Sequence, residues 1–162
     1  MPTKMSPKEK LPSKLETDLQ YASSTIEKKI KLIASPTLIK RWVREAIAHS
    51  GSITLRFVNQ TEGKKLNFAF RHKDKATNVL TFPYELSKNY LAADIIFCLP
   101  VIEKEASEQG KTVKVHLAHL IIHGCLHAQG LDHEIEKDAK KMEAREIKLL
   151  KSLGFPNPYA LI

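Results

Sequence analysis

Residues 123–133 read His123-Gly124-Cys-Leu-His127-Ala-Gln-Gly130-Leu-Asp-His133, which is the spacing H-x-x-x-H-x-x-G-x-x-H. On a helix, His123 and His127 would project from one face, one turn apart, and could reach the same ion. Gly130 can take a positive φ, which lets the helix stop and the chain bring His133 back toward that ion. Three imidazoles leave one tetrahedral position for water, as in catalytic zinc sites. The stretch therefore predicts a zincin-like metal helix of a hydrolase, with Zn²⁺ or another divalent ion bound by the three histidines.

Chance clustering is the alternative to a metal site, because an isolated histidine on a helix is usually an ordinary core or surface residue. Five of the seven histidines, however, fall between positions 116 and 133. His116 and His119 precede His123 by seven and four residues, on the same helical face. We expect these two side chains to support the ligands or to face the substrate.

The composition is that of a globular protein with an excess of positive charge. A chain of 162 residues can bury a core as one domain. Cys98 and Cys125 lie in apolar stretches, which predicts buried thiols rather than a disulfide. The net charge of +8 favours polyanionic partners such as RNA. Lysines and prolines stand where a secreted protein has an apolar leader, so we expect a cytoplasmic protein without membrane association.

Hydrophobic periodicity and helix-start signals predict strands and helices in mixed order. Strands are expected over residues 19–23, 52–59, 79–84 and 92–99, and helices over 36–49, 61–70, 100–109, 113–128 and 136–153. This order predicts an α+β (mixed α/β) fold, a small, mostly four-stranded sheet packed on helices. It should form a single domain over residues 16–162, after a basic flexible arm at 1–15. Inward-facing side chains should include Phe70 and the stripe Ala139, Met142, Leu149 and Leu153.

The residue at position 124 helps to distinguish a peptidase from an enzyme that hydrolyses phosphodiesters. Metzincin proteases share the histidine spacing but carry a glutamate after the first histidine as general base, where this chain has Gly124. A phosphodiester substrate instead needs positive charge near the oxygens of the reacting phosphate. Arg71 is the predicted catalytic residue, because a guanidinium can grip a phosphate through two hydrogen bonds. Arg71, Lys73 and Lys75 form the predicted substrate-binding set.

Two motifs resemble those of the YbeY endoribonuclease family. Residues 123–133 are similar to the family's H-G-x-L-H-x-x-G-x-D-H, and residues 66–83 to its L-N-x-x-Y/F-R-x-x-D-x-P-T-D/N-V-L-S-F-P, with Ala76 in place of proline. The resemblance implies an α/β metalloprotein fold with a zinc-like ion on the three histidines, and it makes Arg71 the matching arginine. It also implies a single-strand-specific endoribonuclease that acts in 16S rRNA maturation and ribosome quality control, with ribosomal RNA and the small ribosomal subunit as partners.

The same features allow two alternative functions. A metallopeptidase would share the histidine spacing. A non-enzymatic ribosome-assembly factor, in contact with ribosomal or assembly proteins, would use the ion only to hold its fold. In that case replacing His133 should unfold the domain, whereas a catalytic ion predicts lost activity with the fold largely kept.

Overall fold

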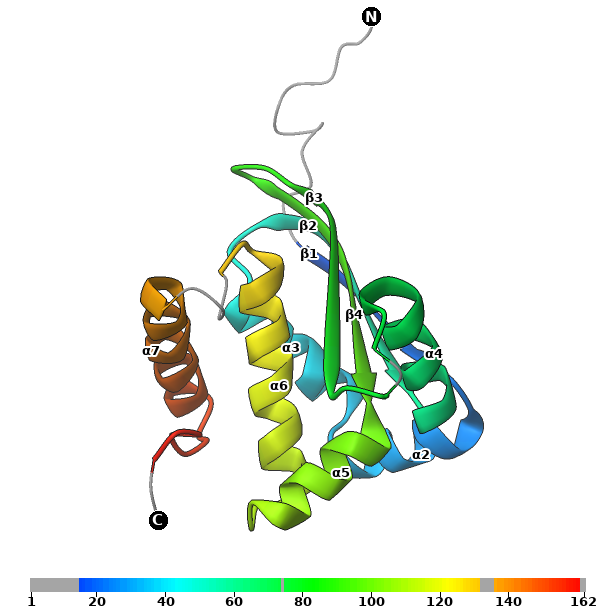
Figure 1. Cartoon of the computed structure of the whole chain (residues 1–162). Coiled ribbons are helices and arrows are strands. Elements are labelled where there is room, and N and C mark those ends of the chain that lie inside the picture. The colour runs from blue at the N-terminus through cyan, green and yellow to red at the C-terminus, as the bar shows by residue number, and fades with distance from the viewer. Residues whose placement is uncertain (1–14, 74, 132–135, 161–162) are drawn as a thin grey trace, which may run out of the picture.

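A computed structural model describes residues 15–73, 75–131 and 136–160, which form four strands and six helices (Figure 1). The strands are β1 (Leu15–Tyr21), β2 (Ser50–Val58), β3 (Val79–Leu86) and β4 (Tyr90–Cys98). The helices are α2 (Ser24–Ile33), α3 (Pro36–Ala46), α4 (Gln60–Arg71), α5 (Leu99–Glu108), α6 (Val113–Ala128) and α7 (Glu136–Ser152). The mixed α/β fold with a four-stranded sheet, predicted from the sequence, is confirmed.

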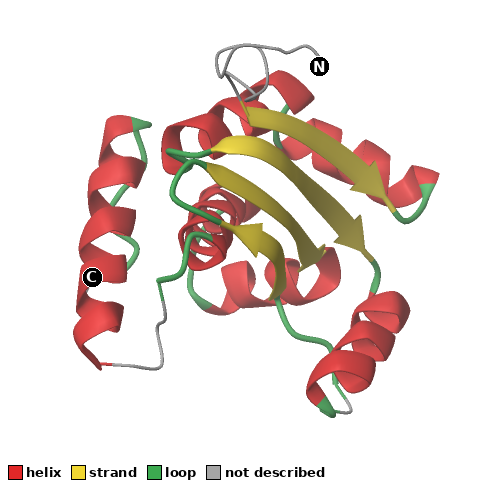
Figure 2. Ribbon diagram, turned by 90° about the horizontal axis from the view of Figure 1, so that it is seen from above, coloured by secondary structure: helices red, strands yellow, loops and turns green. Residues whose placement is uncertain are grey.

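The sheet has the strand order β1-β2-β4-β3, with β3 at one edge (Figure 2). β1 and β4 both run parallel to β2, whereas β3 pairs antiparallel with β4 through a hairpin. Gly51 on β2 is paired with Leu91 on β4 and has φ +132°. A Cβ at position 51 would overlap the Leu91 carbonyl, so this close approach of two strands requires glycine.

The two faces of the sheet carry separate apolar clusters. The larger core lies between the sheet and the helices α2, α3, α5 and α6, and its β4 members are Leu91, Ala93, Ile95 and Phe97. The opposite face carries a smaller cluster of Val58, Leu80, Ile96 and Cys98, against which Leu66 of α4 packs. α4 and α6 therefore cover opposite faces of the sheet, while α7 packs on the outer side of α6 (Figure 1).

Several helices begin where the sequence signals placed them. Ser35 caps α3 by accepting a hydrogen bond from the Leu38 amide, and Pro36 occupies the first helical position. β1 begins at Leu15, four residues earlier than predicted. Helix α2 was not predicted, although Ser23 caps it in the same way. Residues 1–14 of the expected arm lie outside the described residues.

The predicted inward position of Phe70 is wrong. Its side chain is 63% exposed, and its ring meets the edge of the Phe82 ring at 5.0 Å between centroids. The buried positions of α4 are Gly63 and Asn67 instead. Cys98 and Cys125 are buried free thiols, as predicted, and burial raises the pKa of each. No helix in the described part of the chain is long and apolar enough to cross a membrane.

Candidate metal centre

Helix α6 carries the histidines, and most of its residues are buried. Thr112 caps the helix by accepting a hydrogen bond from the Val115 amide. Gly124 faces the sheet, where an added Cβ would lie 3.0 Å from Cγ2 of Ile95. The glycine thus allows α6 to approach β4 closely. A general-base glutamate at this position, as a metzincin peptidase has, would have to displace Ile95, which gives the peptidase alternative no support.

His123 and His127 lie one turn apart on α6, and both are partly buried. The Nδ1 of His127 lies 2.9 Å from the Leu131 carbonyl oxygen and donates to it. Gly130, at φ +97°, turns the chain so that this carbonyl faces back toward the helix. The Nδ1 of His123 donates over 2.6 Å to Oε2 of Glu146 on α7. In both rings the protonated Nδ1 fixes the tautomer whose lone pair is on Nε2, as a metal ligand requires.

Glu146 accepts hydrogen bonds from three side chains of the site. Its side chain is fully buried, and Oε1 accepts hydrogen bonds from His119 Nε2, at 2.9 Å, and from the Tyr159 hydroxyl. Burial by itself would raise the pKa of Glu146, but the hydrogen bonds from His119, His123 and Tyr159 outweigh it and lower the pKa to about 2. Burial and the neighbouring carboxylate raise the pKa of Tyr159. Glu146 is therefore an ionised acceptor that ties α7 to α6 and orients two histidines.

The ligand atoms of His119, His123 and Glu146 lie within 4.8 Å of one another, so these three residues could hold a metal ion. Their separations of 2.6 and 2.9 Å are hydrogen-bond lengths. Two atoms bound to one zinc at about 2.0–2.1 Å lie roughly 3.3 Å apart at the tetrahedral angle. An ion among these three would have to push the carboxylate away from both rings. The arrangement fits better a carboxylate that supports a histidine ligand from behind.

The sequence-based ligand set is only partly placed by the structure. His123 and His127 share one face of α6, while His133 lies outside the described residues, and its role stays a prediction. A cavity of about 230 Å³ opens beside His123, between α6 and α7, and Glu143, Glu146 and Tyr159 line part of it. The described residues thus offer two oriented imidazoles, and that of His123 lies at the edge of a small hollow.

The predicted substrate-binding residues lie on the other face of the sheet. Arg71 is the last residue of α4, and Arg71, Lys73 and Lys75 are all exposed. His72 ends the helix in the left-handed conformation, with φ 57°. Among the described residues, no hydrogen bond or ion pair joins Arg71 to a histidine of α6. β3 is the edge strand of the sheet, so the Arg71 loop and α6 lie on opposite faces next to that edge.

A polar chain links the loop after α4 to α6. The Asn78 amide donates to Oε1 of Glu105 on α5 over 3.0 Å, and His116 Nε2 donates to the same oxygen over 2.8 Å. Burial lowers the pKa of His116, and the bond to Glu105 offsets only part of this effect, so the ring is held neutral. His116 therefore anchors the start of β3 to α6. His116 is buried and not solvent-exposed, and its described partner is Glu105, not a histidine ligand, so its expected role beside the ligands stays a prediction.

Sequence reasoning assigned no role to Glu146, Tyr159 or Glu105. Glu146 stands one turn after Met142 and one turn before Leu150, which are the other buried residues of α7. The predicted stripe of that helix was therefore incomplete. A carboxylate at the centre of an apolar stripe is the signal that could have found it, because a buried charge requires partners. Tyr159 and Glu146 also match the C-terminal ending of the YbeY family in sequence, but that resemblance gave neither residue a role.

The fold and the site define a mixed α/β protein with a histidine–carboxylate centre between a buried helix and its neighbour. The family model described as Endoribonuclease YbeY matches residues 14–154, and the chain belongs to this family. A relative from Polynucleobacter asymbioticus, named Endoribonuclease YbeY, is 69% identical over 147 residues, which cover 91% of this chain and 95% of the relative.

Two further proteins are less similar in sequence. The protein of the same name from Burkholderia ambifaria is 49% identical over 152 residues, or 91% of this chain and 87% of its own. A solution structure of a Thermotoga maritima protein aligns with 91% of this chain and 99% of its own, with 21% identity and a TM-score of 0.47.

Proposed function

We propose that this chain is a metal-dependent endoribonuclease that hydrolyses phosphodiesters in single-stranded RNA. Its substrate is 16S ribosomal RNA in the cytoplasm, and the small ribosomal subunit is its partner in maturation and quality control. The observation that carries the proposal is the pair His123 and His127, each oriented through Nδ1, in a chain of the Endoribonuclease YbeY family. The ligand set is completed by His133, and the ion is Zn²⁺ or a similar divalent metal.

When bound, the ion would act as a Lewis acid toward the phosphate oxygens. The chain's own residues prepare the site for it. Glu146 fixes the ring of His123, and the Leu131 carbonyl fixes the ring of His127. Neither ring would have to reorient when the ion binds, so the site is pre-organised.

Arg71 is the residue we assign to the phosphate. A guanidinium binds a phosphate in a fixed, two-pronged geometry and keeps its charge at any physiological pH. Its loop is attached to α6 through the Asn78–Glu105–His116 chain, which holds the start of β3 near the histidines. An RNA strand that passes around the β3 edge can therefore meet both Arg71 and the ion. Lys73 and Lys75 would contact the flanking backbone.

The domain assignment follows the same reasoning. Residues 16–162 form the catalytic domain, which is supported by the family match over residues 14–154. The basic segment at 1–15 is an added RNA-contacting or solvated arm.

The decisive experiment is cleavage of purified 16S rRNA precursor and of a single-stranded oligonucleotide by the purified protein, with and without a chelator. We expect cleavage that stops on chelation and returns with added metal. His127→Ala should lose both metal and cleavage, whereas Arg71→Ala should lose cleavage while elemental analysis shows unchanged metal content. Arg44→Ala, which removes an exposed arginine on α3, is the matched control and should behave as the wild type.

Two outcomes would contradict the proposal. Cleavage that persists in the chelator and in the His127→Ala variant would remove the metal from the mechanism. Full activity of Arg71→Ala would remove that residue from it. Metal-dependent digestion of a peptide without cleavage of RNA would instead identify a peptidase.

A further inference from the structure

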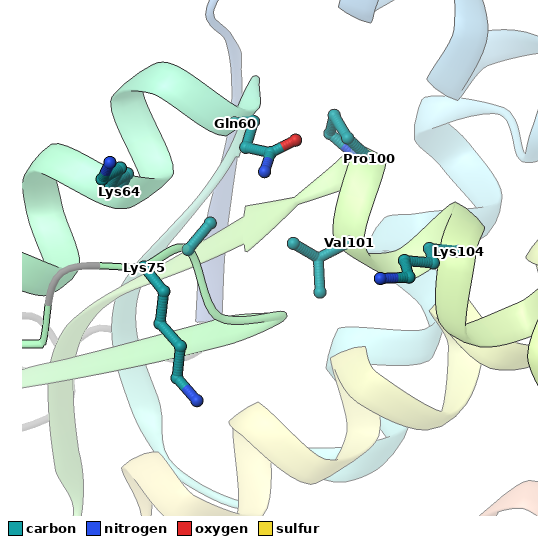
Figure 3. A pocket seen from close by; sticks show the side chains of 7 residues that line it. Gln60, Lys64, Lys75, Pro100, Val101 and Lys104 are labelled. Atoms are coloured by element: carbon teal, nitrogen blue, oxygen red, sulfur yellow. The ribbon is translucent and has the colours of Figure 1, made fainter.

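A lysine-lined pocket lies on the α4 side of the sheet, away from the histidines. It has a volume of about 340 Å³, and its lining comes from α4, from the loop after it, and from the first turns of α5. Three of its lining residues are lysines, Lys64, Lys75 and Lys104, and none of the described lining residues is acidic. In Figure 3 the Lys104 side chain extends from α5 toward the hollow. A hollow with three lysines in its lining favours an anion.

The walls of this pocket are held in place by buried contacts. Asn67, which is 1% exposed, donates from its side-chain amide to the Lys75 carbonyl oxygen over 2.6 Å. This bond fixes the backbone from which the Lys75 side chain extends. Gly63 brings α4 close to the start of α5, because an added Cβ there would lie 3.0 Å from Sγ of Cys98. The pocket is therefore a built feature of the fold and not a chance gap between flexible side chains.

The pocket is also connected to the proposed active site. Lys104 lines the pocket, and its neighbour on α5, Glu105, accepts the hydrogen bonds from Asn78 and His116. The loop between α4 and β3 supplies Lys75 to the pocket and Asn78 to that chain of hydrogen bonds. A single polymer that follows this loop would meet the pocket at one end and the α6 histidines at the other. A polyanionic strand suits such a path better than a small free anion does.

We propose that the Lys64–Lys75–Lys104 pocket binds a backbone phosphate of the single-stranded RNA substrate, several nucleotides from the bond that is cleaved. This inference rests on the proposed function and adds a second anchoring point to it. Lysines bind phosphate as point charges without reading bases, so the pocket positions the strand and does not select its sequence. Pro100 and Val101 of the first α5 turn also line the pocket, and the positive end of the helix dipole adds to its preference for phosphate.

The test measures binding of a fluorescent single-stranded RNA of about 12 nucleotides, a length within the range that such sites cover. Fluorescence anisotropy is recorded over a series of salt concentrations, with the His127→Ala protein as a parent that does not cut the RNA. In this background the pair Lys75→Ala and Lys104→Ala is compared with Lys40→Ala and Lys151→Ala. The control pair removes the same charge from exposed positions on α3 and α7.

We expect the pocket pair to weaken binding about tenfold near 0.1 M salt and to reduce the slope of log K against log salt by about 0.7, since each lost phosphate contact on a single strand contributes about 0.7. The control pair should leave that slope close to the parent's. All the lysines are exposed, so circular dichroism should show every variant folded.

Equal slopes for the pocket pair and the parent would overturn this inference while leaving the endoribonuclease function intact. Equal losses in the pocket and control pairs would overturn it too, because the effect would then be one of overall charge. Failure of the parent to bind RNA, together with no cleavage by the wild-type protein, would overturn both this inference and the proposed function.

Discussion

Glu146→Gln tests the centre of the site. The substitution keeps the shape of the side chain but removes its charge, and it replaces one of the two oxygens that accept from His119 and His123 with an amide NH₂. The lowering of the Glu146 pKa from 4.5 to about 2 means that the surroundings favour the charged form by about 3 kcal/mol. An amide resembles the neutral form, so we expect the free energy of unfolding to fall by about 3 kcal/mol at pH 7. Urea denaturation of the metal-free protein measures this loss.

The pH dependence of that loss has a definite sign. Because the folded pKa lies below the ordinary value, the extra stability is present above pH 4.5 and is lost as the pH falls toward 2. The difference in unfolding free energy between the wild type and Glu146→Gln should therefore shrink on acidification. Metal affinity should also fall, by 10- to 100-fold, because His123 loses the acceptor that orients it. Competition with a chromophoric chelator measures this affinity.

Glu136→Gln is the matched control on the same helix. Its carboxylate lies 3.8 Å from Lys140, and both side chains are exposed, so its loss should change stability by well under about 1 kcal/mol. Tyr159→Phe should cost about 1 kcal/mol and should be non-additive with Glu146→Gln, since both substitutions change the hydrogen bond between these two side chains. A Glu146→Gln protein as stable as the wild type, with unchanged metal affinity, would refute the assignment of Glu146 as an ionised acceptor that orients the histidines.

Three further predictions concern the scaffold. Gly51→Ala should destabilise by more than about 3 kcal/mol, seen as a large drop in melting temperature, because its Cβ would overlap the Leu91 carbonyl at a positive φ. Gly124→Ala should cost about 1 kcal/mol in thermal denaturation, since contact with Ile95 outweighs the gain in helix propensity; a stabilised variant would show that Ile95 gives way. His116→Gln should remove the loss of stability that occurs as the pH falls below about 6.5, because the folded protein lowers the pKa of this histidine; an unchanged pH profile in urea denaturation would contradict this.

Local signals in the sequence were sufficient for most of the fold. The capping serine and proline at the start of α3 and the alternating apolar residues of β2 depend on neighbours within a few positions. Gly130 marked the end of α6 for the same reason, since its positive φ is a property of the residue itself. The histidine spacing placed His123 and His127 on one face because helical geometry is fixed.

The remaining features depend on contacts between distant segments. Phe70 was expected inside because it follows the helical period, but α4 packs through Gly63 and Asn67, and Asn67 is buried to hold the Lys75 carbonyl. Glu146 was overlooked because a charged residue does not register in an apolar pattern. Its partners lie 23 and 27 positions away, and only the packing of α7 on α6 brings them together.

That separation has a consequence for the order in which the protein matures during synthesis. The ribosome makes α6 before α7. An emerging chain therefore has the imidazoles of His119 and His123 well before it has the carboxylate of Glu146. Domains generally fold as units once all their segments are available. A polypeptide released before position 146 would carry His119 and His123 without the carboxylate that aligns them. Premature termination would then yield a fragment in which His123 lacks the acceptor that orients its ring.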